Sequence, residues 1–127
     1  MSRSKKMKVF EKMQVLKDGK VILNNAKSLR NPLRMMKGLM FSTKIKAPLV
    51  FCFRHEKRLS FHMFFVFYTI DAVFLDKNKK VTEIKESFRP FTAYQTKNKA
   101  IFVIEAEQGF VKKNRIKEGD VLQFKKA

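Results

Sequence analysis

The feature that most constrains the fold is a series of short apolar runs, each ended by a polar turn. These runs are too short for ordinary helices, and several are rich in β-branched and aromatic residues, as strands are. Asp18 and Gly19 separate two such runs, and Asp-Gly suits a two-residue hairpin turn because both central residues need a positive φ. A second polar turn, 76–80, separates two later runs. The sequence therefore predicts at least two β-hairpins.

Seven or eight strands and one or two short helices account for the chain. The expected strands are 9–17, 21–23, 49–53, 59–63, 70–75, 81–85, 100–106 and 121–124. Apolar residues at three- to four-residue spacing predict a helix within 28–40, and a helical turn is expected within 108–114. Segment 54–58 is expected to be a charged turn and 87–98 a long loop. We expect one α+β domain over residues 1–127, mostly antiparallel β, forming a compact sandwich or barrel-like sheet, with 1–6 as a loose basic arm.

The charge balance is the main clue to a partner. The chain has 29 Lys and Arg against 11 Asp and Glu, a net charge of +18. Residues 1–46 hold 13 of the basic side chains and two of the acidic ones. Such a field attracts polyanions, of which RNA and DNA are the commonest. The alternative is that the charge keeps a Phe-rich domain soluble and protects sheet edges from pairing.

The basic residues of the N-terminal third are the candidates for contact with an anion. They are Lys5, Lys6, Lys8, Arg30, Arg34, Lys37, Lys44 and Lys46. The leading hypothesis is a non-catalytic binding module for an anionic partner, with RNA or DNA as one option. Interleaved Phe residues could stack bases, but they gather in apolar clusters typical of a core.

Catalytic and metal motifs are absent from the sequence. Cys52 is the only cysteine, which excludes an intrachain disulfide and a cysteine metal cluster, and it reads as a small buried hydrophobe. His55 and His62 with Glu56 fall short of the three or four ligands of a zinc site. No nucleophile elbow, phosphate loop or dinucleotide fingerprint is present. We therefore expect no catalytic residue, no metal and no cofactor.

Asp71 is the most informative acid because it interrupts a buried strand. A carboxylate there must be hydrogen-bonded, paired or shifted in pKa. It could accept backbone donors or pair with an arginine such as Arg34 or Arg54. Alternatively, Asp71, His62, Tyr94 and Arg34 could line the cleft of an enzyme or small-ligand binder. Glu105 raises the same question, although it could also be an outward residue of its strand.

Two further expectations concern location and partners. The N-terminus has charges without an apolar stretch behind them, and the apolar run 63–75 contains Asp71 and is shorter than the roughly 20 residues of a membrane-spanning helix. We therefore expect a cytoplasmic protein.

A third functional hypothesis is an adaptor that presents Met35, Met36 and Met40 to a partner protein.

Several segments in order resemble one family. Segment 37–41 resembles a Gly-Leu-Met box, and 49–53 resembles the strand that follows it. Segment 61–76 resembles a stretch with two acidic positions, filled here by Asp71 and Asp76. The tail 103–124 matches a pattern filled here by Glu105, Gly109, Ile116, Gly119 and Asp120.

The chain thus resembles the widespread domain-of-unknown-function family numbered 192, over roughly residues 20 to 125. The resemblance implies a compact α+β domain rich in antiparallel strands and implies no activity. Many relatives have Trp-Met-Lys-Asn-Thr where this chain has His62-Met63-Phe64-Phe65-Val66. Apolar bulk therefore replaces a polar triplet, which argues against shared polar chemistry there.

Overall fold

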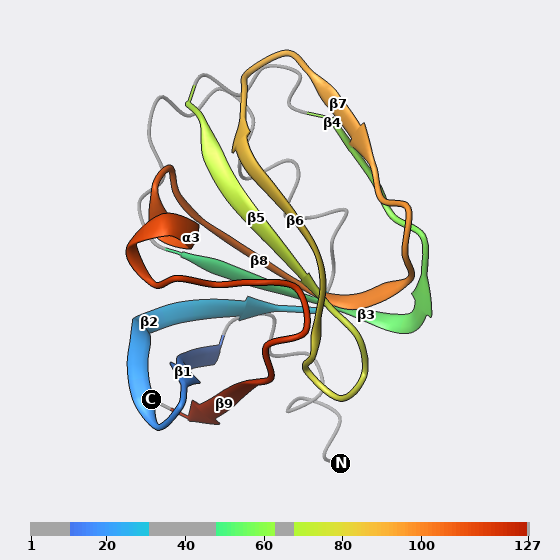
Figure 1. The fold of residues 1–127 in the computed structure, drawn as a ribbon. Coiled ribbons are helices and arrows are strands. Elements are labelled where there is room, and N and C mark those ends of the chain that lie inside the picture. The colour runs from blue at the N-terminus through green and yellow to red at the C-terminus, as the bar shows by residue number, and fades with distance from the viewer. Residues whose placement is uncertain (1–10, 31–47, 63–67, 127) are drawn as a thin grey trace.

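A computed structural model describes residues 11–30, 48–62 and 68–126 (Figure 1). In chain order its elements are β1 (Glu11–Lys17), β2 (Lys20–Leu29), β3 (Leu49–Lys57), β4 (Ser60–His62), β5 (Ile70–Leu75), β6 (Val81–Phe88), β7 (Ala93–Gln95), β8 (Ala100–Glu107), α3 (Phe110–Lys113) and β9 (Leu122–Lys126). The α+β fold class with mostly antiparallel strands is confirmed.

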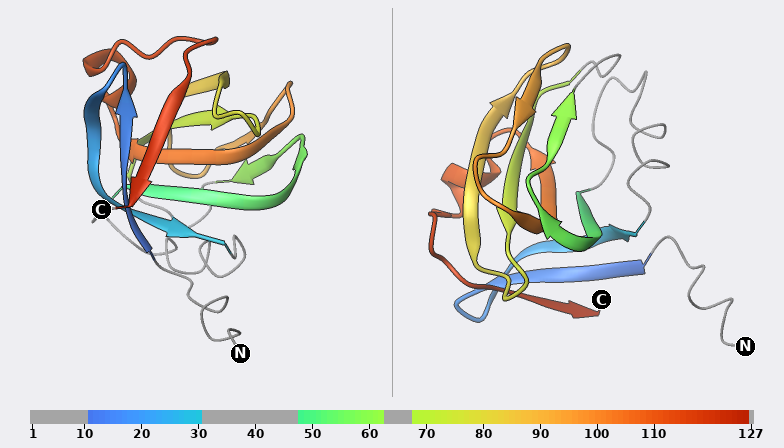
Figure 2. Two further views of the ribbon diagram at one scale, coloured as in Figure 1. Left: turned by 90° about the horizontal axis from the view of Figure 1, so that it is seen from below. Right: turned by 90° about the vertical axis from the view of Figure 1, so that its right-hand side faces the viewer.

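One seven-stranded sheet organises the molecule, in the order β6-β5-β8-β3-β2-β1-β9. All its neighbouring strands are antiparallel except β2 and β3, which are parallel. The strands β4 and β7 form a separate two-stranded sheet. The seven-stranded sheet bends, so that β1, β2 and β9 lie below the remaining strands (Figure 2).

The two edges of the large sheet meet at one corner without closing a barrel. Lys80, just before β6, forms an isolated bridge with Val121, just before β9. The Val81 N–H donates to the Asp120 carbonyl at 2.7 Å, and the Gly119 N–H donates to the Val81 carbonyl at 2.8 Å. These bonds connect the edges and leave an open, barrel-like sheet.

Two apolar clusters pack on opposite faces of this sheet. We call them the first core and the second core. Residues of β5 alternate between them, because successive side chains of a strand point to opposite faces. Ile70, Ala72 and Phe74 belong to the first core, whereas Val73 and Leu75 belong to the second. All six residues of β5 are buried, which explains why this strand reads as a nearly continuous apolar run.

Long-range pairing extends two strands beyond their expected ends. β2 continues through Ser28 and Leu29, where the sequence predicts a helix start, because these residues pair with β3. β3 continues to Lys57 through the expected charged turn, because Lys57 pairs with Ala100 of β8. The rest of the expected helix 28–40 and the arm 1–6 lie outside the described residues. β7 also falls within the expected loop 87–98.

Candidate functional site

Asp71 braces the sheet against the segment that carries α3. Its carboxylate accepts the Ser87 N–H at 3.0 Å, the Gly109 N–H at 3.1 Å and the Val111 N–H at 3.0 Å. The residue is 1% exposed. Of the alternatives for Asp71, the structure therefore shows backbone donors, and it leaves the carboxylate out of reach of solvent.

Glu83 is a second buried acid whose oxygens are occupied. Its carboxylate accepts the Tyr94 hydroxyl, the backbone N–H groups of Lys97 and Asn98, and the Asn98 side-chain amide. Burial raises the pKa of Glu83, but these hydrogen bonds outweigh burial and the pKa is lowered overall. Burial and the bond to Glu83 raise the pKa of Tyr94 to about 12. These bonds join β6 to β7 and to the loop before β8.

Glu105 differs from both. It lies in β8 between Leu49 of β3 and Ala72 of β5, its partners across the two flanking strands, and it is 4% exposed. Its Oε1 atom has no hydrogen-bond partner among the residues that the structure describes. Burial raises the pKa of Glu105 to about 8, so the carboxyl is mostly protonated at neutral pH. The alternative of an outward-facing strand residue is excluded, because the Glu105 side chain is buried on the face of the sheet that carries the first core.

Tyr68 brings a second unsatisfied polar atom to the same face. Its ring packs against the first core, to which Leu49 and Ala72 also belong. Its hydroxyl is buried without a partner in the described ranges, and its pKa is raised by burial and by the nearby Glu105. An unpaired buried polar group costs about 1–3 kcal/mol, which makes this pair the least satisfied polar feature in the described structure.

Asp71 and Tyr94, two residues of the expected cleft, lie on opposite faces of the sheet. Tyr94 packs against the first core. Asp71 points to the opposite face of the sheet, where its donors Gly109 and Val111 lie on either side of Phe110 of the second core. His62 lies in β4, paired with Ala93 of β7. Arg34 lies outside the described residues.

The expected anion contacts fall mostly outside the described ranges. Arg30 is exposed at the end of β2. The others lie in undescribed segments, as do the three Met residues of the adaptor hypothesis: Lys5, Lys6, Lys8, Arg34, Lys37, Lys44, Lys46, Met35, Met36 and Met40. Contact of these basic residues with an anion stays a prediction.

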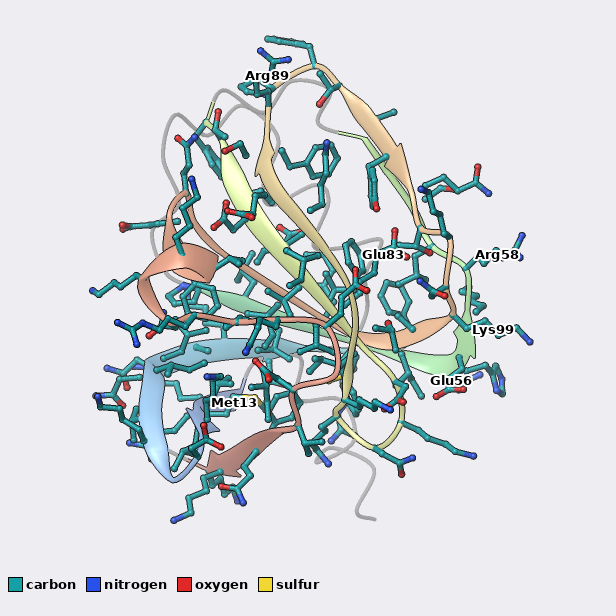
Figure 3. All side chains as sticks on the ribbon, viewed as in Figure 1. Met13, Glu56, Arg58, Glu83, Arg89 and Lys99 are labelled. Atoms are coloured by element: carbon teal, nitrogen blue, oxygen red, sulfur yellow. The ribbon has the colours of Figure 1, made fainter. Side chains whose placement is uncertain are left out.

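A different group of cations gathers at one end of the sheet, and we call it the cationic rim. It consists of six exposed side chains: Lys57, Arg58, Lys77, Lys80, Lys97 and Lys99. They lie at the end of β3 and in the connections that follow β3, β5 and β7. These segments contact one another, since the Lys77 N–H donates to Glu56 near the end of β3 and the Asn98 amide donates to the Thr82 carbonyl near the start of β6. Figure 3 shows Arg58 and Lys99 projecting outward on this side. The sequence shows basic turns but not that these turns meet.

Two other features of the described residues bear on ligand or metal binding. A groove of about 310 Å³ lies where β2 and β8 approach α3, with Leu23, Ala106 and Phe110 among its apolar lining and Lys113 among its polar lining. No group of three or more His, Cys, Asp or Glu residues suited to a metal ion occurs within 11–30, 48–62 and 68–126.

Comparison with known proteins decides the family. The family model DUF192, described as "Uncharacterized ACR", matches residues 13–124. The chain belongs to the DUF192 family. A UPF0127 protein from Thermococcus sibiricus is 32% identical over 108 residues, which cover 84% of this chain and 70% of that protein. A UPF0127 protein from Thermococcus gammatolerans is 32% identical over 94 residues, covering 72% of this chain and 61% of that protein.

Solved structures share the DUF192 fold seen here. A candidate transcription regulator from Sinorhizobium meliloti superposes with a TM-score of 0.75 at 17% identity, over 91% of this chain and 93% of that chain. A protein of unknown function from Novosphingobium aromaticivorans gives a TM-score of 0.77 at 19% identity, over 90% and 84% of the two chains. Among the described helices of this DUF192 chain, none has the length and apolar character needed to cross a membrane.

Proposed function

We propose that this DUF192 domain is a non-catalytic module that binds polyanions, RNA or DNA among them, through the cationic rim. The single observation that carries the proposal is that six exposed cations lie on neighbouring segments at one end of the sheet, which hydrogen bonds join to one another. A cluster of this kind, on a chain with a net charge of +18, matches the repeating phosphates of a nucleic acid.

The acids near the rim are fewer than its cations and form hydrogen bonds to backbone donors in place of ion pairs with the rim side chains. Glu56 accepts the Lys77 N–H at 2.7 Å, and Asp76 accepts the N–H groups of Asn78 and Lys80 at 2.8 and 3.0 Å. These carboxylates are directed at backbone donors. In the described part of the chain, the ion pairs join Lys17 to Asp18 and Asp120, and neither includes a rim side chain.

The rim favours contact with phosphates over reading of bases. Its members are mainly lysines, which act as mobile point charges on flexible stems. The Lys57 ammonium lies 5.8 Å from the centroid of the half-buried Phe53 ring. A ring covered in this way offers little surface for stacking, so we expect weak sequence preference and strong dependence on salt.

Two other lines of support are consistent with this proposal. A protein of the same fold is described as a candidate transcription regulator, a class that works on nucleic acid. Arg30 and the basic residues of the N-terminal third would enlarge the contact surface beyond the rim. The proposal places the domain in the cytoplasm, where such partners are available.

The test is a salt series of binding to fluorescent single-stranded RNA and duplex DNA. The variant Arg58→Gln/Lys97→Gln/Lys99→Gln removes three rim charges. The matched control Lys112→Gln/Lys113→Gln/Lys117→Gln removes three exposed charges from α3 and the turn after it. We expect the rim variant to weaken binding and to lower the slope of log K against log salt by about one for each lost phosphate contact.

The Lys112→Gln/Lys113→Gln/Lys117→Gln control should keep the parent protein's slope of log K against log salt. Equal losses in the two variants would mean that net charge alone drives binding, and the rim would lose its role. Failure of the parent protein to bind either nucleic acid at low salt would remove the proposed function.

A further inference from the structure

We infer that Glu105 and Tyr68 form the polar end of a binding site for a small, uncharged, largely apolar molecule that carries an amide head group. This site lies on the first-core face of the sheet and is independent of polyanion binding at the rim. The inference rests on two buried polar atoms that share one apolar environment and lack partners among the described residues, Glu105 Oε1 and Tyr68 Oη.

The other two buried acids in this comparison, Asp71 and Glu83, both have hydrogen-bond donors for their carboxylates. Asp71 accepts three backbone N–H groups, and Glu83 accepts donors from Tyr94, Lys97 and Asn98. Glu105 is equally deep, at 4% exposure, yet its Oε1 receives nothing from the same set of residues. Native proteins rarely leave such atoms unpaired, and the recognised reasons include a functional role and a water or ion held at the site.

The chemistry of the pair selects an uncharged partner. Leu49 on β3 and Ala72 on β5 flank Glu105, and Tyr68 is the titratable group near it. With a pKa raised to about 8 by burial, the carboxyl is a neutral acid at pH 7 that both donates and accepts hydrogen bonds. Tyr68 keeps its proton and adds a donor. An amide presents a carbonyl acceptor beside N–H donors, which complements these groups.

The surroundings of the pair explain why the rest of the ligand should be apolar. The ring of Tyr68 and the side chains of Leu49, Ala72 and Val103 belong to, or pack against, the first core. An ammonium head would have to enter this apolar region from water and would meet the positive field of the whole chain. A carboxylate head would also have to leave water for this apolar region, and that cost is large for an ion.

The experiment uses the full chain and three probes of equal length, hexanamide, hexylamine and hexanoate. Binding is followed by NMR, through the ¹³C shift of the Glu105 carboxyl and the ring signals of Tyr68. We expect hexanamide to saturate both signals at pH 7 and the two charged probes to leave them unchanged. Tyr68→Phe should weaken hexanamide binding about fivefold to tenfold, the effect of one lost hydrogen bond.

Two substitutions at Glu105 separate chemistry from folding. Glu105→Gln keeps a donor and an acceptor, so it should still bind hexanamide. The parent protein should lose binding above pH 8 as Glu105 ionises, whereas the Gln variant should bind equally well above and below pH 8. Glu105→Leu should lose binding while remaining folded, because Leu fits the apolar neighbours. The control Glu107→Gln changes an exposed acid two residues along β8 and should bind like the parent.

Three results would overturn the inference. These are saturation of the Glu105 signal by hexylamine in place of hexanamide, no response to any probe, and a scalar coupling that shows the Glu105 carboxyl already bonded to another side chain of the chain. None of these results affects polyanion binding, which has its own assay.

Discussion

Replacement of Asp71 by alanine tests the view that this carboxylate is a structural brace. The substitution removes the acceptor of three N–H groups, those of Ser87, Gly109 and Val111. The bond to Val111 is buried, so that donor stays unpaired and costs about 1–3 kcal/mol. The bonds to Ser87 and Gly109 are partly buried, and their donors can reach water, so each adds less.

Together these losses predict a decrease of about 4 kcal/mol in the free energy of unfolding, a large share of the 5–15 kcal/mol typical of a domain. At about 2.1 cal/mol/K of unfolding entropy per residue, this decrease lowers the melting temperature of the chain by roughly 15 °C. Asp71→Asn keeps one acceptor oxygen and should lose about half as much.

The assay is urea unfolding followed by far-UV circular dichroism. When the m-value is the same in the variant and the parent, a change in the midpoint is a change in stability. Glu107→Ala, at an exposed position of the neighbouring strand, serves as the control and should change stability by less than about 0.5 kcal/mol. A decrease in the free energy of unfolding below about 1 kcal/mol for Asp71→Ala would refute the structural role of Asp71, because even one unpaired buried donor costs at least about that much.

Two further predictions concern the other buried acids. Because the pKa of Glu105 is raised to about 8 in the folded state, the folded protein holds this proton more tightly than the unfolded one, so stability should fall as pH rises from about 5 to 8, by up to roughly 1.4 kcal/mol per pH unit. Urea unfolding across this range should show that the free energy of unfolding falls with pH in the parent protein and stays level in Glu105→Gln. The same dependence on pH in both proteins would count against a raised pKa of Glu105. Tyr94→Phe should destabilise by about 1–2 kcal/mol and raise the pKa of Glu83, because it removes the hydroxyl that donates to this carboxylate. A ¹³C titration of Glu83 that matches the parent would contradict the second effect.

The local parts of the fold could be predicted from the sequence. Asp18 and Gly19 form the expected turn, both with positive φ, and the helical turn expected within 108–114 appears as α3. The missed strand ends depend on distant partners. Lys57 lies in a run of charged residues and is a strand residue only because Ala100 pairs with it.

The same reason limits what the sequence could say about the site. The alternation of β5 predicts that Asp71 faces away from Ile70 and Ala72, but its donors at Gly109 and Val111 come from 38 and 40 residues along the chain. Glu105 looks like an ordinary outward acid in its own segment. It is buried because it lies beside Leu49 and Ala72 on the face of the sheet that carries the first core, and this order of strands is a property of the whole sheet.

The pairing of β1 with β9 has a consequence for how the molecule assembles. Val15 lies opposite Phe124, so β1 gains its outer neighbour from a segment that the ribosome makes much later than β1. Until then the β1–β2 hairpin presents an unpaired edge with Lys12 and Lys17 along it, and lysines on an exposed edge discourage pairing with other chains. Part of the positive charge of this protein would then protect the nascent chain during the wait for β9.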